Sequence, residues 1–293
     1  MTETGSASFK AAVVQMRSGV DPAANLEQMT RLVREAASAG ADYIQTPEMT
    51  GLVQQQRKPF FETVRTQSDD VLVKAASALA KELGITLHIG STAIRLSDTK
   101  AAKRAFLFGP DGVLIETYDK MHMFDVDLDN GESWRESAVY QPGEAAKLVD
   151  VCGAKTGLAI CYDCRFPALH LAYALAGAEV LTGPSCFTRQ TGEAHWHVLL
   201  RSRAIENGAY MIAAAQGGAM EDGRETFGHS IIIAPWGRVI AEVEGDEPGF
   251  AIADIDTAQV AAARAKIPNL RNQQDITLVD AVTRTGALPE RAA

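Results

Sequence analysis

The chain carries a cysteine at a predicted strand-to-helix turn, a position that suits a nucleophile. Residues 156–160 are small or apolar and read as a buried strand, which stops at Cys161. Phe166 and Pro167 then open a predicted helix through Leu175. At such a turn the side chain is held rigidly, and free backbone N–H groups can bind an oxyanion. A thiol placed there is a candidate nucleophile with oxyanion donors beside it.

Two charged residues could complete this chemistry. Glu48 follows the predicted strand 43–46, and Lys120 follows the predicted strand 113–117. Because ligands of open α/β sheets gather at the carboxyl ends of strands, both side chains could meet Cys161 there. The carboxylate would take the thiol proton, the thiolate would attack a carbonyl, and the ammonium would stabilise the oxyanion. Taken singly, each residue is more often a surface charge or a buried apolar thiol.

Composition argues against several classes of protein. A length of 293 residues allows a large core, and the net charge of −9 without a basic cluster argues against a nucleic-acid partner. We find no secretory signal and no run of eighteen apolar residues, so no membrane association is expected. Four cysteines do not make a disulfide scaffold in a chain of this length. We therefore expect a cytoplasmic protein with reduced thiols.

Strand and helix patterns alternate along the chain. Each half reads as strand–helix–strand–helix followed by several strands, which hints at a duplicated pattern within a single layered α/β domain. Residues 277–293 read as a loosely held C-terminal tail. The predicted helices span residues 22–40, 69–84, 166–175 and 193–207, and the other predicted strands span 9–16, 86–90, 104–108, 147–151, 179–183, 210–215, 229–234, 238–243 and 250–254.

The motifs around these residues resemble those of the nitrilase superfamily, the carbon–nitrogen hydrolases with a Glu–Lys–Cys triad. The resemblance covers about residues 9–276, which we take as the hydrolase domain. It implies a four-layer α-β-β-α sandwich, assembly into homodimers or higher homo-oligomers, and no metal or organic cofactor. The motifs that carry it are 46–48, 119–126 and 160–167, with further matches at 136–137, 141–143, 192–196, 203–207, 228–230 and 235–237.

The resemblance also implies roles for individual residues. It makes Glu48 the general base, Lys120 the oxyanion stabiliser and Cys161 the residue that is acylated. It places Glu136, a second acid in many members, near the nucleophile, where it would orient the lysine or the substrate. Taken from the sequence alone, Glu136 would read as a surface carboxylate.

Three further residues are candidate substrate contacts: Tyr162, Arg165 and His195, of which His195 could equally be a satisfied packing histidine. Arg165 matches a position that helps to hold the substrate carboxylate in carbamoyl-amino-acid hydrolases of the superfamily. The neighbouring position, where those enzymes carry a second arginine, is Cys164 here, which argues against that specificity. A competing interpretation is that Arg165 pairs with Asp163 or another acid and only braces the turn.

Residues 192–196 and 213–217 most resemble the branch that contains deaminated-glutathione amidase and omega-amidase. That branch usually has a glutamate directly after His-Trp, whereas this chain has His197. The resemblance implies hydrolysis of the terminal amide of a small carboxylate-bearing molecule, with release of ammonia. Nitrile and N-carbamoyl hydrolysis, which use the same triad, stay open as alternatives.

Other classes of function were weighed against this one. Cys161 and Cys164 form a C-x-x-C pair, the spacing of redox motifs and of half a zinc site. The pair lies past the middle of a long chain, and no second such pair or matching histidine pair accompanies it. An inactive scaffold is a further alternative, which the complete triad disfavours.

Overall fold

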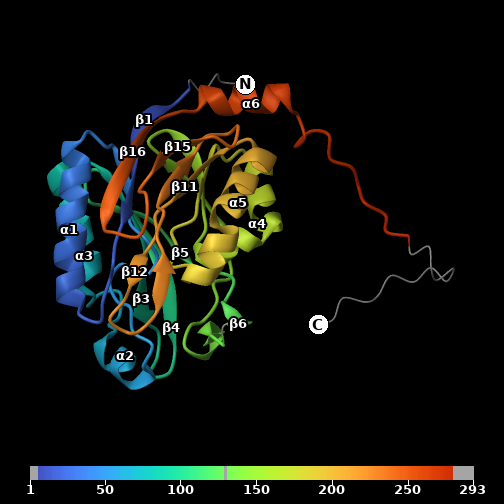
Figure 1. Ribbon diagram of the computed structural model, residues 1–293. Coiled ribbons are helices and arrows are strands. Elements are labelled where there is room, and N and C mark those ends of the chain that lie inside the picture. The colour runs from blue at the N-terminus through green and yellow to red at the C-terminus, as the bar shows by residue number, and fades with distance from the viewer. Residues whose placement is uncertain (1–5, 129–130, 280–293) are drawn as a thin grey trace.

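Two six-stranded mixed sheets form the centre of the molecule (Figure 1), which a computed structural model describes over residues 6–128 and 131–279. In spatial order the first sheet contains β16 (Gly249–Asp256), β1 (Ser8–Gln15), β2 (Tyr43–Gln45), β3 (Thr86–Arg95), β4 (Ala101–Phe108) and β5 (Leu114–Asp119). The second contains β15 (Val239–Glu242), β14 (Ile231–Ile233), β11 (Tyr210–Ala213), β10 (Val180–Thr182), β9 (Ala154–Leu158) and β8 (Lys147–Val151).

Helices cover the outer face of each sheet. Figure 1 shows α1 (Pro22–Ser38) and α3 (Val71–Leu83) on the outer side of the first sheet, and α4 (Pro167–Leu175) and α5 (Arg189–Asn207) on the outer side of the second. The arrangement is the four-layer α-β-β-α sandwich that the sequence predicted.

The two sheets repeat one strand pattern. From β16 to β5, the successive pairings are antiparallel, parallel, parallel, antiparallel and antiparallel. From β8 to β15 the order of pairings is the same. The predicted duplication is therefore confirmed, and β16, near the end of the chain, completes the first sheet beside β1.

Alternating side chains along each central strand build three core layers. In β1, Ala12 and Val14 pack toward α1 and α3, whereas Val13 packs between the sheets. In β11, Ile212 faces the first sheet and Met211 packs toward the helices of the other side. Because both faces of each sheet are buried, the middle stretches of these strands, such as residues 11–14 and 210–213, are apolar on both faces rather than alternating with polar residues.

Several short elements were absent from the sequence prediction, and one helix begins earlier than predicted. Helix α5 begins at Arg189 and not at residue 193, because the Thr188 side chain caps its N-terminus by accepting from the Thr191 N–H. The unpredicted elements are α2 (Arg57–Thr63), α6 (Ala258–Lys266), the hairpins β6 (Asp125–Asp127) with β7 (Ser133–Arg135) and β12 (Gly217–Ala219) with β13 (Glu225–Phe227), and the 3-10 helices η1 (Glu136–Ala138) and η2 (Cys161–Arg165).

The C-terminal part of the chain is described as far as residue 279. After α6, residues 267–279 contain neither helix nor strand. Most of the predicted tail, residues 280–293, lies outside the described residues, so the boundary at 276 stays a prediction. Within the described ranges, no helix is long and apolar enough to cross a membrane.

Candidate active site

Cys161 lies in a strained turn between a strand and the helix that follows it. It is the first residue of η2, between β9 and α4, and its backbone φ is +50°. Since a left-handed conformation costs a non-glycine residue roughly 1–2 kcal/mol, neighbouring bonds must hold it. One of them runs from the Cys161 N–H to the carbonyl of Pro184, at 2.9 Å, just beyond β10. The side chain is buried but lines a cavity.

The carboxylate of Asp163 fixes this turn to the loop that carries Lys120. Its Oδ2 accepts hydrogen bonds from the Ile160 N–H at 2.9 Å and the Tyr118 hydroxyl at 2.7 Å. Its Oδ1 accepts from the His122 N–H at 3.0 Å. Tyr118 and His122 lie on either side of Lys120 in the sequence, so one fully buried carboxylate sets the position of Lys120 relative to Cys161.

Glu48 follows β2 and is held by residues of both halves of the molecule. The Gln216 side chain, from the chain beyond β11, donates to the Glu48 carbonyl at 3.0 Å. Met49, with a φ of +60°, donates its N–H to the Ser91 hydroxyl at 2.9 Å. The carboxylate is thereby directed into the interior, where the Glu48 side chain is 2% exposed.

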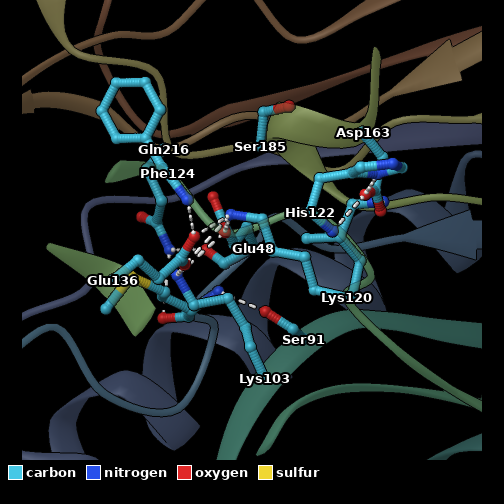
Figure 2. A network of polar contacts seen from close by, with 12 residues as sticks. Glu48, Ser91, Lys103, Lys120, His122, Phe124, Glu136, Asp163, Ser185 and Gln216 are labelled. Atoms are coloured by element: carbon cyan, nitrogen blue, oxygen red, sulfur yellow. Dashed lines mark hydrogen bonds and ion pairs between the residues drawn. The ribbon is translucent and has the colours of Figure 1, made fainter. Parts of the chain in front are cut away.

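Two ammonium groups and two carboxylates form a buried charge cluster: Glu48, Lys103, Lys120 and Glu136. Lys120 Nζ lies 3.0 Å from Glu48 Oε1 and 2.8 Å from Glu136 Oε2. Lys103 Nζ lies 3.0 Å from Glu48 Oε1 and also contacts Glu136 Oε1. The Phe124 N–H donates to Glu136 Oε2 at 2.6 Å. Figure 2 shows both amino groups directed at both carboxylates.

Mutual pairing keeps all four groups of the charge cluster ionised. Burial alone would raise the pKa of Glu48, but the ammonium groups of Lys103 and Lys120 lower it to about 2. Burial alone would lower the pKa of Lys120, but the carboxylates of Glu136 and Glu48 raise it well above its usual value. Burial also raises the pKa of the Cys161 thiol, which hydrogen-bonds to Glu48. At rest, a neutral thiol therefore faces an ionised base.

The cluster and the thiol open onto a cavity of about 270 Å³. Tyr162 and Arg165, two of the three predicted substrate contacts, line this cavity, whereas the third, His195, is exposed and does not line it. The charged side chains around the cavity are mostly cationic: Arg57, Lys103, Lys120, Arg135, Arg165 and Arg224, against Glu48, Glu136 and Glu225.

Arg57 and Arg165 line the cavity and form no ion pair among the described residues, but Arg57 donates to the carbonyls of Ala138 and Thr99, whereas Arg165 contacts neither a carbonyl nor a carboxylate. Its Nη2 lies 3.2 Å from His195 Nδ1, and its guanidinium lies 5.3 Å from the centre of the Phe187 ring. It forms no ion pair with any acid in the described part of the chain. Asp163, the acid considered as its partner, is engaged by Tyr118 and His122 instead. Arg165 can therefore receive an anionic ligand, and His195 acts on it from outside the cavity.

Sequence reasoning missed three residues of the site. Lys103 was missed although a lysine within the apolar strand β4 is an unusual signal. Gln216 belongs to a motif of the resemblance but had no assigned role. Arg224 lines the cavity with its guanidinium 5.0 Å from the Trp134 ring centre, and it pairs with Asp222 at 2.8 Å.

Two residues whose roles the sequence did not decide, His197 and Cys164, do not line the cavity. His197, the departure from the branch motif, places Nε2 at 2.9 Å from Glu242 and does not line the cavity. Cys164 is 1% exposed within the core, and burial raises the pKa of its thiol to about 12. Both cysteines of the C-x-x-C pair are free.

Comparison with known proteins agrees with this geometry. The model of the carbon–nitrogen hydrolase family matches residues 10–265. The chain belongs to the carbon–nitrogen hydrolase family. This carbon–nitrogen hydrolase is 37% identical to human deaminated glutathione amidase over 270 residues, which cover 90% of this chain and 81% of the human one.

Solved structures of the nitrilase superfamily superpose on it. The crystal structure of Nit3 from Saccharomyces cerevisiae, a member of branch 10 of the superfamily, matches with a TM-score of 0.80 and 28% identity, over 91% of this chain and 97% of that one. A variant of the amidase from Nesterenkonia sp. AN1, with acrylamide added at its active-site cysteine, matches with a TM-score of 0.74 and 25% identity, over 90% and 99%.

Proposed function

We propose that this hydrolase cleaves the terminal amide of a small carboxylate-bearing molecule and releases ammonia, through a thioester on Cys161. The observation that carries the proposal is the charge cluster beside the Cys161 thiol at the cavity wall. An ionised base, an ammonium and a thiol are the groups that acyl transfer to a nucleophilic cysteine requires. The amidase activity named for the human and Nesterenkonia relatives supports an amide as the substrate.

In the acylation step, Glu48 takes the thiol proton as Cys161 sulfur attacks the amide carbon. The carbonyl oxygen becomes an oxyanion, which Lys120 Nζ stabilises by charge and hydrogen bonding. In this proposal the Tyr162 N–H, at the second position of η2, is a further donor. Collapse of the tetrahedral intermediate breaks the C–N bond, and protonated Glu48 returns its proton to nitrogen, so that ammonia leaves and a thioester remains.

Deacylation repeats these roles with water as the nucleophile. Glu48, again ionised, takes a proton from water as the water oxygen attacks the thioester carbon. Lys120 stabilises the second oxyanion, the C–S bond breaks, and the proton passes to Cys161 sulfur. The product is the free carboxylic acid, and the enzyme regains its resting protonation state.

Arg165 provides the preference for an acidic substrate in this proposal. Its guanidinium lines the cavity without an ion-pair partner in the described residues. A bidentate bond to a substrate carboxylate would fix the amide relative to the thiol. His195, 3.2 Å from Arg165, would orient the guanidinium and not touch the substrate itself.

The experiment that tests the nucleophile is mass spectrometry of the enzyme during turnover of amides, nitriles and N-carbamoyl compounds. We expect ammonia from acidic amides and an acyl adduct on the peptide that contains Cys161. The Cys161→Ser variant should keep its fold and lose turnover by orders of magnitude. Cys186→Ala, which alters another cysteine of the same cavity, is the control. An adduct on Cys164, or a preference for nitriles, would contradict the proposal.

We also propose that the enzyme is a homo-oligomer of the cytoplasm. Large apolar side chains of α4 and α5 are exposed, among them Leu175 at 57%, Val198 at 68% and Ile205 at 50%. Exposed apolar groups of this kind favour association with another surface. The four free cysteines fit a reducing compartment. Light scattering of wild type and Val198→Asp would test the assembly.

A further inference from the structure

All the donor capacity of Lys120 is already used in the resting site. An ammonium has three N–H groups, and Lys120 Nζ lies 3.0 Å from Glu48 Oε1, 3.0 Å from Glu136 Oε1 and 2.8 Å from Glu136 Oε2. To stabilise an oxyanion, the group must therefore weaken one of these bonds. Without compensation, that movement would leave a buried carboxylate short of a partner, which is costly.

Lys103 contacts the same two carboxylates from another strand. Its Nζ lies 3.0 Å from Glu48 Oε1 and contacts Glu136 Oε1, and it stands 4.7 Å from the centre of the Tyr140 ring. Its side chain is 7% exposed. The backbone ties the two lysines together, since the Lys120 N–H donates to the Lys103 carbonyl at 3.0 Å.

We propose that Lys103 is a positioning residue, which holds Glu48 and Glu136 in place and ionised while Lys120 turns toward the oxyanion. The inference rests on the proposed acyl transfer at Cys161. Its basis is the charge balance of the cluster, in which two ammonium groups match two carboxylates. With Lys103 removed, one ammonium would face two buried carboxylates, and one of these would take up a proton.

Within the described part of the chain, Glu48 forms ion pairs with Lys103 and Lys120 and with no other cation. Arg224, another cation of the cavity wall, is engaged by Asp222 and Cys186. The ionisable groups that act on Glu48 or Lys103 from the surrounding elements are Lys103 in β4, Lys120 after β5, Glu136 in η1, Tyr140 after η1, Cys161 in η2 and Cys186 after β10.

The test measures the rate at which iodoacetamide alkylates Cys161 as a function of pH, resolved by peptide mass spectrometry. The alkylation rate depends on the protonation states of the Cys161 thiol and of Glu48, and its measurement does not require turnover of an amide. For Lys103→Met, we expect the acidic limb of the profile to move up by at least one pH unit, about tenfold in rate at a pH on that limb. Lys103→Arg, which keeps the charge, should restore part of the wild-type profile.

A charge-balanced double variant makes the test specific. Lys103→Met with Glu136→Gln leaves one ammonium and one carboxylate, so its acidic limb should return toward that of wild type. This variant also serves if the single variant does not fold. Lys100→Met is the matched control, because Lys100 precedes the same strand and its Nζ donates to the Ser137 carbonyl. Its profile should equal that of wild type.

Two results would overturn the proposal. The first is a folded Lys103→Met variant with an unmoved acidic limb, particularly if KM for an acidic amide rises while kcat holds, since Lys103 would then bind substrate. The second is a double variant whose acidic limb is shifted to higher pH as far as that of Lys103→Met. If the limb moves as expected but no amide is hydrolysed by wild type, the proposed substrate fails and the role of Lys103 stands.

Discussion

The Tyr118 hydroxyl donates a 2.7 Å hydrogen bond to Oδ2 of Asp163, and this bond connects the two halves of the active site. Tyr118 belongs to β5 of the first sheet, two residues before Lys120. Asp163 belongs to η2, which follows β9 of the second sheet, two residues after Cys161. The distance between Lys120 and Cys161, the proposed oxyanion stabiliser and nucleophile, therefore depends on a contact that neither residue makes itself.

Tyr118→Phe should lower turnover more than its effect on stability explains. The change removes one hydrogen bond from a buried carboxylate, at a cost of about 1–3 kcal/mol in the free energy of unfolding. Since the loop that carries Lys120 loses a support, we expect kcat to fall about tenfold or more, because small misplacements of catalytic groups reduce rates strongly. Urea unfolding and steady-state kinetics measure the two effects.

Tyr173→Phe is the control for this prediction. The Tyr173 hydroxyl donates to the Leu158 carbonyl at 2.6 Å and accepts from the Lys147 N–H at 3.0 Å, so its loss also removes buried hydrogen bonding, but none that reaches the lysine loop. It should destabilise the fold to a similar degree while kcat stays near that of wild type. If both variants lost turnover equally, the Tyr118 contact would have no particular role in aligning the site.

Glu48→Gln should abolish both half-reactions and change the acid sensitivity of the fold. The amide cannot accept a proton, so we expect turnover to fall by a factor of about 10² to 10⁴. The pKa of Glu48 is lowered to about 2 in the folded protein, against about 4.3 in an unfolded chain. Its ionisation therefore stabilises the fold above about pH 4.3, and this contribution is lost as the pH falls toward 2.

Urea unfolding at pH 6 and pH 3 measures that contribution. Wild type should lose more stability between the two values than Glu48→Gln, because the glutamine has no proton to take up. Glu62→Gln is a suitable control, since Glu62 is a largely exposed acid in α2 that pairs with Lys58 only at 3.9 Å. An equal pH dependence in wild type and Glu48→Gln would show that Glu48 is not held ionised by its neighbours.

The sequence could predict the residues that stand directly after the carboxyl end of a strand. Glu48 follows β2, Lys120 follows β5 and Cys161 follows β9, and the structure brings the three together. Lys103 escaped this reasoning because β4 runs antiparallel to β3 and β5. The amino end of β4 therefore lies beside the carboxyl ends of β3 and β5. A residue near the start of β4 reaches the same site as the residues that follow the neighbouring strands.

Burial was the property that sequence reasoning predicted least well. Glu136 read as a surface carboxylate from the sequence alone, yet its side chain is 7% exposed. Such burial becomes tolerable only because two lysines from elsewhere in the chain neutralise it, and that pairing has no local signature. His195 shows the opposite case, since the sequence left a packing residue and a cavity wall open as alternatives, and the side chain is exposed and contacts Arg165 outside the cavity.

Arg165→Met should separate acidic substrates from neutral ones. The variant keeps much of the apolar stem over Phe187 and removes the guanidinium, so binding of a substrate carboxylate is lost while the triad is untouched. Because hydrogen bonds to charged groups contribute about 1.5–3 kcal/mol each, kcat/KM on an acidic amide should fall at least tenfold. The variant should hydrolyse a neutral amide of similar size almost as fast as wild type does.

Arg57→Met is the control, because it alters another cation that lines the cavity and that is bonded to the Ala138 carbonyl. Equal losses on both amides would show instead that Arg165 braces the turn and does not bind the carboxylate.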